Sequence, residues 1–354
     1  MKYSMKAGRI LKIITYFNNK GGVGKTTLAV NVASFMATHF GKKVLFLDAD
    51  PQANSTQMMV PDQFWLDYYG ERASKSTIMN FLSPIIEGDS GLNFIDELYM
   101  GTANRYNVDL IPGHPGLSVI EDIFSDAWNK SLGGDIGGFR RTNWLRQMKQ
   151  HYASTYDYMF IDVGPSLGAL NRSILLNTDF VVTPMGSDIF SLIGVSNIST
   201  WIKEWMHSYR RAVHVLYDRH GSQSAEKYLF NLDIDKTTKL IGFSIQQYVT
   251  RTFADGRRPI AAYESIIIQV PEAIEKHLNY LIYNNLTIEE LNLGDVPYLY
   301  SLVPLAQASK SPMYSLVRGD GVVGGQTSSV KKYKEILDSI TRKLLKNMGD
   351  LNAD

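Results

Sequence analysis

Cysteine is absent from the 354 residues of this chain. A chain without thiols cannot form disulfide bonds, ligate zinc through cysteine or hold a cysteine-bound iron–sulfur cluster. Long apolar runs are absent too, because no stretch approaches the roughly 18 apolar residues of a membrane-spanning helix. We find no internal repeat and no low-complexity segment, and the seven histidines show no spacing typical of a metal site.

A strong excess of either charge is also missing, since 36 lysines and arginines face 35 aspartates and glutamates for a net charge of +1. This balance argues against a protein that coats DNA through a uniformly basic surface, although a local basic face is compatible with it. The hydrophobic content of 44% and the charged content of 20% are typical of a folded globular protein.

The first 17 residues loosely resemble a secretory signal peptide, because basic residues precede a short apolar run. The apolar run is too short, Lys12 adjoins it, and no small-residue cleavage site follows. We therefore predict a first β-strand here and a cytoplasmic protein.

A glycine-rich segment at residues 18–27 follows that strand, and apolar side chains recur at helical spacing over residues 28–36. Strand, loop and helix in this order are the context that a phosphate-binding loop requires. Glycines let backbone N–H groups turn inward around phosphate oxygens, and the start of the helix adds partial positive charge. We expect Lys25 to reach the β- and γ-phosphates and the Thr26 hydroxyl to ligate Mg²⁺.

This loop departs from the standard pattern G-x-x-x-x-G-K-[ST], since Asn19 stands at the first glycine position. It matches K-G-G-x-G-K-T-[ST] in full, and so resembles the deviant Walker A motif of the ParA/MinD family, above all of the ParA-type partition ATPases. The resemblance implies an ATPase whose loop contacts the nucleotide through Lys20, Gly21, Gly22, Val23, Gly24, Lys25, Thr26 and Thr27.

Two lysines in one loop imply two roles. One lysine, Lys25, already serves the chain's own nucleotide. In the family that the loop resembles, the extra lysine contacts phosphates bound by the partner subunit of a face-to-face dimer. The resemblance therefore implies that Lys20 acts in trans on the transferring phosphoryl group, and that ATP joins two subunits.

Two aspartates, Asp48 and Asp50, follow an apolar run that predicts a buried strand over residues 43–48. The carboxyl end of such a strand is where ligands bind in open α/β sheets. The string resembles the family motif D-x-D-P-Q, which implies that Asp50 positions the attacking water and contributes to the metal site. By the same resemblance Asp48 couples the nucleotide state to the dimer surface. The alternative is a strand-terminal turn built from aspartate and proline.

Another apolar run, at residues 156–162, ends at Asp162 and has the pattern of a Walker B motif. The carboxylate of that motif holds Mg²⁺, here through water, and we expect Thr26 and Asp50 to complete the metal site. The family more often has D-x-P-P at this point. Gly164 replaces the first of those prolines, and we expect it to loosen the loop.

Further strands are predicted near residues 109–113, 177–184, 239–245 and 298–304, with helical patterns between them. This alternation predicts an α/β fold with a mainly parallel, doubly wound sheet flanked by helices. Together with the loop, it places the chain in the P-loop NTPase fold class.

Residues 303–312 resemble the family loop that packs near the adenine, which makes Pro304 and Pro312 candidate nucleotide-binding residues. The family's E-A-P is replaced there by Lys310-Ser311-Pro312. Gln246 or Gln247 could read the edge of the base through a side-chain amide, and a solvent-facing amide is an equal alternative.

We predict one P-loop ATPase domain over residues 1–354, because a minimal family member is shorter and the surplus falls in separate segments. These are insertions near residues 57–108, 125–150 and 202–238 and a C-terminal helix near 329–348. The loop begins at Lys20, so we expect no helix-turn-helix domain before it. Exposed insertions can carry partner specificity, and neutral elaboration of loops is the alternative.

The predicted C-terminal helix combines a basic face with an apolar stripe at spacings of three and four, formed by Tyr333, Leu337, Ile340, Leu344 and Met348. Docking on the chain's own core is favoured, contacts to DNA phosphates are compatible with it, and a membrane-surface helix is least favoured. The candidate DNA-binding residues, on this helix and on a loop near the nucleotide edge, are Lys331, Lys332, Arg342, Arg251, Arg257 and Arg258.

The resemblance implies a switch with ATP and Mg²⁺ as cofactors that forms a homodimer on binding ATP and then binds nonspecific DNA. A centromere-binding, ParB-like protein or another activator would stimulate slow hydrolysis, and the cargo would be a plasmid, a chromosome region or a protein assembly. We expect a cytoplasmic, nucleoid-associated protein without stable membrane anchoring. The alternatives are a conjugation or phage-defence switch module, and a P-loop small-molecule ligase or kinase. Iron–sulfur carriers that share the loop are excluded by the lack of cysteine.

Overall fold

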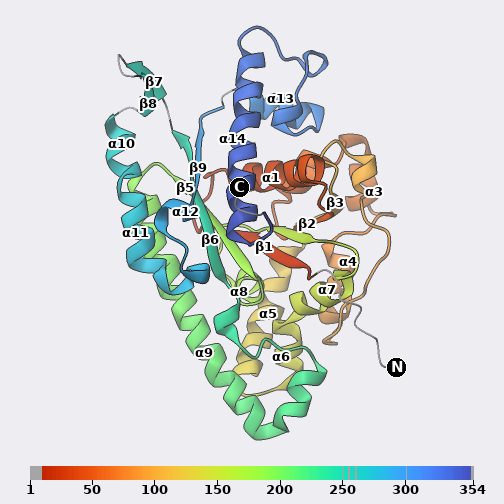
Figure 1. Ribbon diagram of the computed structural model, residues 1–354. Coiled ribbons are helices and arrows are strands. Elements are labelled where there is room, and N and C mark those ends of the chain that lie inside the picture. Colours follow the sequence, from red (N-terminus) through yellow and green to blue (C-terminus); the bar gives the residue numbers. More distant parts are fainter. Residues whose placement is uncertain (1–9, 249, 254–255, 260, 300, 352–354) are drawn as a thin grey trace.

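A seven-stranded sheet forms the centre of the protein (Figure 1). The computed structural model of the chain describes residues 10–248, 250–253, 256–259, 261–299 and 301–351. The strand order is β3-β2-β4-β1-β5-β6-β9, and every pairing within this sheet is parallel. The strands are β1 (Lys12–Tyr16), β2 (Val44–Asp48), β3 (Asp109–Ile111), β4 (Tyr158–Asp162), β5 (Phe180–Gly186), β6 (Lys239–Tyr248) and β9 (Asn292–Pro297).

The central strands are apolar along nearly their whole length because helices cover both faces of the sheet. Strand β1 lies between β4 and β5, and β2 lies on the other side of β4. Asp162 of β4 is in register with Tyr16 of β1 and with Asp48 of β2. The carboxyl ends of β1, β2 and β4 therefore meet at one edge of the sheet, which is where a doubly wound fold binds its ligands.

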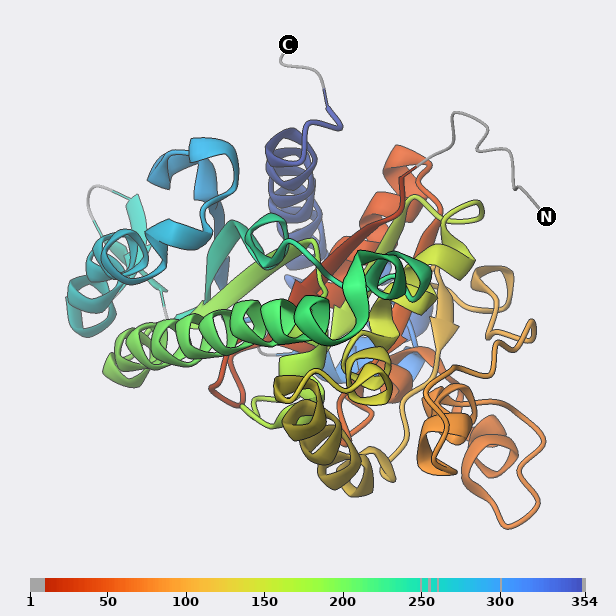
Figure 2. The ribbon, with the colours of Figure 1, turned by 90° about the horizontal axis from the view of Figure 1, so that it is seen from below.

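Two separate hydrophobic clusters fill the space between the sheet and its helices. One cluster packs α1 (Lys25–Phe40), α13 (Leu302–Ser309) and α14 (Gln326–Asn347) against one face. The other packs the opposite face, where α9 runs along the sheet (Figure 2). The helices of that second layer are α4 (Ile78–Ile86), α5 (Leu117–Leu132), α6 (Ile136–Thr142), α7 (Trp144–Tyr152), α8 (Ala169–Leu175), α9 (Ile189–Lys227) and α11 (Gln269–Leu278).

The remaining elements are short. They are α2 (Asn54–Met59), α3 (Trp65–Tyr69), α10 (Ala261–Ile267), α12 (Ile288–Leu291) and an antiparallel hairpin of β7 (Thr250–Phe253) and β8 (Gly256–Pro259), which projects at one corner of Figure 1. The insertion predicted at 57–108 contains α3 and α4, that at 125–150 contains α6, and that at 202–238 begins within α9. No helix within the described ranges is both long and apolar enough to span a membrane.

The fold class predicted from the sequence is confirmed, and so is the docking of the last helix on the core. The apolar stripe of α14 is buried against the sheet, from Tyr333 to Met348. The strand predicted at residues 298–304 is wrong, because β9 ends at Pro297 and α13 begins at Leu302. A proline within the first helical turn is tolerated since its missing N–H would have no partner there, so Pro304 does not prevent the helix.

Candidate nucleotide-binding site

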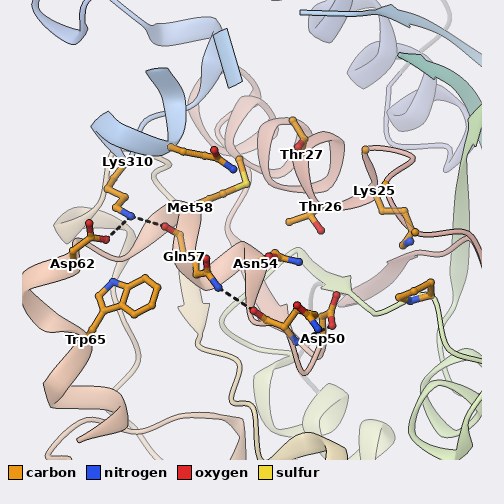
Figure 3. A pocket seen from close by; sticks show the side chains of 16 residues that line it. Lys25, Thr26, Thr27, Asp50, Asn54, Gln57, Met58, Asp62, Trp65 and Lys310 are labelled. Atoms are coloured by element: carbon orange, nitrogen blue, oxygen red, sulfur yellow. Dashed lines mark hydrogen bonds and ion pairs between the residues drawn. The ribbon is translucent and has the colours of Figure 1, made fainter. Parts of the chain in front are cut away.

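The glycine-rich loop connects the end of β1 to the start of α1. Gly22 and Gly24 have φ values of 74° and 76°, in the left-handed region that favours glycine, and Gly24 is the N-cap of α1. A Cβ added at Gly21 or Gly22 would meet no atom within 4 Å, so the backbone of the loop faces open space. That space is a cavity of about 750 Å³, drawn in Figure 3.

Lys25 lies at the base of this cavity and is almost fully buried. Its Nζ donates a hydrogen bond of 2.9 Å to the carbonyl oxygen of Lys20, which holds the side chain along the loop. Burial lowers the pKa of Lys25, while the nearby charges of Asp162 and Asp50 favour its protonated form. The ammonium is therefore placed between two carboxylates and the open side of the loop.

Lys20, the second lysine of the loop, takes a different direction. Its Nζ forms an ion pair with Asp188, which lies between β5 and the start of α9. Partial burial pushes the pKa of Asp188 upward, but hydrogen bonding to Lys20 and its positive charge lower that pKa overall. The Lys20 backbone N–H donates to Asn18 Oδ1 at 2.9 Å. Asp188 was not predicted from the sequence, because no motif marks it.

Asp50 reaches the cavity from the turn after β2. Its Oδ1 accepts a hydrogen bond of 2.9 Å from the backbone N–H of Gln52. A Cβ added at Gly164 would lie only 3.1 Å from that same oxygen. The absence of a side chain at Gly164 thus lets the loop after β4 come close to Asp50.

Asp162 is fully buried at the end of β4 and is not among the residues that line the cavity. Its Oδ2 accepts a hydrogen bond of 2.6 Å from Ser55 Oγ, whereas Oδ1 is buried with no hydrogen-bond partner among the described residues. Burial raises the pKa of Asp162, and the hydroxyls of Ser55 and Thr26 oppose that effect. An unpartnered carboxylate oxygen close to the Thr26 hydroxyl fits Mg²⁺, which prefers oxygen ligands.

Asp48 is buried behind the cavity and is not among the residues that line it. Its Oδ2 accepts hydrogen bonds from the backbone N–H of Thr56 at 2.8 Å and from the Thr56 hydroxyl at 2.7 Å. The Thr56 hydroxyl accepts in turn from the N–H of Gly113 at 2.8 Å. Burial, together with the charge of Asp162, raises the pKa of Asp48 to about 8. Asp48 therefore ties the end of β2 to α2 and to the segment after β3.

The cavity extends well past the loop, toward residues that the sequence did not single out as ligands. Lys310 Nζ lies 2.7 Å from Asp62 Oδ1 and donates to the carbonyl oxygen of Gln57 at 2.8 Å. Figure 3 shows Trp65 beside this group, with Asp50 on the opposite side of Gln57. The ion pair connects the insertion predicted at 57–108 to the end of α13.

A second cavity of about 230 Å³ adjoins the first, and Gly24 and Thr27 line both. Its wall is mainly apolar and comes from β9, α13, α14 and the segments between them: Val296, Pro297, Leu299, Val303, Pro304, Met313 and Tyr333. Gln246 also lines it and donates through Nε2 to Ser244 Oγ at 2.7 Å. Pro312 lines neither cavity, so its predicted contact with the nucleotide stays a prediction. The side chain of Gln247 lies outside the described residues.

The candidate DNA-binding residues lie on two separate elements. Lys331 and Lys332 are exposed on α14, whereas Arg342 donates to Asp338 at 2.8 Å and lies over the Phe40 ring. Arg251 and Arg258 are directly opposite each other in the β7–β8 hairpin, and Arg257 is opposite Thr252. The side chains of these three arginines lie outside the described residues.

Three findings relate this site to known proteins. A family model described as an AAA domain matches residues 11–215, more than half of the chain. The sporulation initiation inhibitor protein Soj of Bacillus subtilis is 31% identical over 192 residues, which cover 54% of this chain and 65% of Soj. The crystal structure of protein DIP2308 from Corynebacterium diphtheriae aligns with a TM-score of 0.72 and 28% identity, over 96% of this chain and 99% of that one.

A fourth comparison concerns the fold alone. The structure of pNOB8 ParA bound to nonspecific DNA aligns with a TM-score of 0.53 at 17% identity, over 97% of this chain and the whole of the other. The match to Soj covers less than two thirds of that relative's length, although the matched structures are covered almost completely. The matched residues 11–215 include the glycine-rich loop, Asp50 and Asp162.

Proposed function

Because this chain belongs to the ParA/MinD family of P-loop ATPases, we propose that it is an ATP-dependent switch for plasmid or chromosome partition or for cargo positioning. ATP binding drives dimerisation, the dimer binds DNA without sequence preference, and a partner protein stimulates slow hydrolysis. The observation that carries the proposal is the different placement of the two loop lysines: Lys25 lies inside the cavity, and Lys20 points away from it toward Asp188.

Each group at the cavity has a defined task in this proposal. The loop N–H groups and Lys25 bind the phosphates, and Asp50 orients the water that attacks the γ-phosphate. Thr26 and the free oxygen of Asp162 are the side chains that would hold Mg²⁺. The metal ion, when bound, supplies positive charge that neutralises the phosphate oxygens. The apolar cavity beside Thr27 is the place for the base.

Dimerisation through the face that carries Lys20 would let this lysine reach the phosphates of a second subunit. The ion pair with Asp188 is partly exposed, so exchanging it for a phosphate contact requires little desolvation. Three exposed apolar side chains follow Asp188 at the start of α9: Ile189, Phe190 and Ile193. An exposed apolar patch beside a polar loop is typical of a surface that another protein covers.

DNA binding in this proposal uses a local basic face, since the chain as a whole is nearly neutral. Lys331 and Lys332 on α14 and the arginines of the β7–β8 hairpin are the candidates, and pNOB8 ParA, which shares the fold, has been seen on nonspecific DNA. The apolar stripe of α14 is packed on the core, so this stripe is not available to a membrane surface. A cytoplasmic, nucleoid-associated location is part of the same proposal. One ATPase domain with insertions is part of the same proposal.

The test is an ATPase assay with and without duplex DNA and with the product of the neighbouring gene. We expect DNA or that partner to stimulate hydrolysis by the wild-type chain. Lys20→Ala should lose both ATP-dependent dimerisation and stimulated hydrolysis, whereas Asp50→Ala should dimerise with ATP and fail to hydrolyse it. Stimulation by neither DNA nor the partner would contradict the partition function.

A small-molecule ligase or kinase is the second candidate, favoured by the extension of the cavity to Trp65 and Lys310. That extension provides room for an acceptor substrate beside the phosphates. An enzyme of this kind would turn over without DNA or an activator protein once its substrate is present. Trp65→Ala would then raise the KM of the acceptor and leave ATP-dependent dimerisation intact.

A further inference from the structure

The side chain of Asn171 reaches from α8 back to the loop that follows Asp162. Its Nδ2 donates one hydrogen bond of 2.8 Å to the carbonyl oxygen of Gly164 and another of 2.7 Å to that of Ser166. Both neighbours are carbonyl oxygens, so only the NH₂ end of the amide can face them. Asn171 is almost completely buried and its bond to Gly164 is buried as well, so water cannot readily replace that bond when it is removed.

The loop that Asn171 holds is in contact with Asp50. Gly164 is the residue whose Cβ, if present, would lie 3.1 Å from Asp50 Oδ1 and 3.4 Å from Cγ. The same Oδ1 accepts the hydrogen bond from the N–H of Gln52. The Asp50 carboxylate is therefore held by its own turn close to the Gly164 loop, and a shift of that loop changes the space available to it.

The helix that carries Asn171 is itself fixed at its start. Glu121, on α5, accepts hydrogen bonds through Oε2 from the backbone N–H groups of Ala169 at 2.6 Å and Leu170 at 3.1 Å. A carboxylate at the first N–H groups of a helix satisfies donors that have no partner within the helix. Asn171 thus projects from a helix whose start is fixed, and its two hydrogen bonds hold the Gly164 loop to that helix.

We infer that Asn171 is a positioning residue for ATP hydrolysis, which holds the Gly164 loop against Asp50 so that this carboxylate stays aligned with the attacking water. The inference rests on the proposed function, because it assigns a role only if Asp50 serves hydrolysis. It concerns the hydrolytic step and not nucleotide affinity, since Asn171 does not line either cavity.

The test compares Asn171→Asp with a matched control, Asn177→Asp. Asn177 is equally buried and its Nδ2 also donates to two carbonyl oxygens, those of Thr142 at 3.0 Å and Ser173 at 2.9 Å, but neither belongs to the Gly164 loop. Stimulated kcat should fall about 100-fold in Asn171→Asp, as expected for a displacement of the reacting groups on the order of 1 Å. The KM for ATP and ATP-dependent dimerisation should stay within about twofold of wild type in Asn171→Asp. The control variant Asn177→Asp should keep the wild-type kcat.

Asn171→Ala, which adds no buried charge, should show the same loss of kcat if Asn171→Asp does not fold.

A double variant shows whether the effect passes through Asp50. In the Asp50→Ala background, adding Asn171→Ala should lower the small residual turnover by less than about twofold, because groups that act as a unit are not additive. Equal losses of kcat in the Asn171 and Asn177 variants, or unchanged kcat in Asn171→Ala, would overturn the inference and leave the proposed function standing. Absence of any stimulated hydrolysis in the wild-type chain would instead overturn the proposed function, and the inference with it.

Discussion

The two adjoining cavities differ in how they are built. The larger one receives its working groups from short segments that follow strands: the glycine-rich loop after β1 and the turn after β2 that carries Asp50. The apolar one combines Gly24, Thr27 and Leu28, from the loop and α1, with residues of the segment from β6 to α14, which lies far from the loop in the sequence. The phosphate-binding groups therefore belong to short sequence motifs, whereas the pocket beside them depends on how the C-terminal third packs.

The largest effect is expected when the Lys25 ammonium inside the larger cavity is removed. Lys25→Ala should lower ATPase turnover by about 100- to 1,000-fold, because a charge preorganised toward the transferring phosphoryl group is lost. Steady-state hydrolysis with the activator present measures this, beside Lys42→Ala, which alters a lysine just beyond the end of α1. If Lys25→Ala retained more than a tenth of wild-type turnover, Lys25 would have no catalytic role.

Changes in the apolar cavity should affect affinity and not turnover. Leu299→Ala should raise the KM for ATP about tenfold with kcat unchanged, since it removes apolar contacts that do not alter during the reaction. Leu66→Ala, at a leucine exposed on α3, is the matched control. A loss of kcat with unchanged KM would mean that the base does not bind in this cavity.

We expect a smaller effect when the partly exposed ion pair between Lys20 and Asp188 is removed. Asp188→Asn should reduce the ATP concentration needed for half-maximal dimerisation by about two- to fivefold, because it frees Lys20 from a partly exposed ion pair. Sedimentation or light scattering during an ATP titration provides the measurement. If dimerisation instead required more ATP, Asp188 would assist assembly rather than compete with it.

Asp48 and Asp50 also differ in their position, because Asp48 is buried behind the larger cavity and Asp50 lines it. The pKa of Asp48 is raised, so the folded chain binds its proton more tightly than the unfolded chain does. The stability associated with that proton is present at low pH and is lost as pH rises toward about 8. Urea unfolding at pH 5 and pH 8 should show a smaller decrease for Asp48→Asn than for wild type, by on the order of 1 kcal/mol. An equal decrease in wild type and Asp48→Asn would show that the charge of Asp48 does not cause this pH dependence of stability.

Much of the phosphate site could be predicted because each of its parts is a short motif of neighbouring residues. The loop from Lys20 to Thr27 needs only a strand before it and a helix after it, and both are evident from apolar spacing. Asp162 could be predicted for the same reason, as the last residue of an apolar run. The structure places Lys25, Asp50 and Thr26 on one cavity, as the motifs indicated.

The parts that could not be predicted depend on contacts between distant segments. Asp188 and Asn171 belong to no motif, and the sequence does not show that Lys310 pairs with the distant Asp62. The strand wrongly predicted at 298–304 shows a second limit, because a short apolar run does not distinguish a strand from a buried helix. Packing against α14 and α2 accompanies the helical form of α13.

The amino-acid sequence by itself determined the kind of ligand that this protein is built to hold, since backbone geometry and a few adjacent side chains suffice to make a phosphate loop. Only the tertiary structure decided where Lys20 points, what surrounds Asp50 and how the apolar cavity is closed. These features arise from parallel strands ending at one edge and from helices packed on both faces. Their energies come from contacts between residues that are separated by most of the chain.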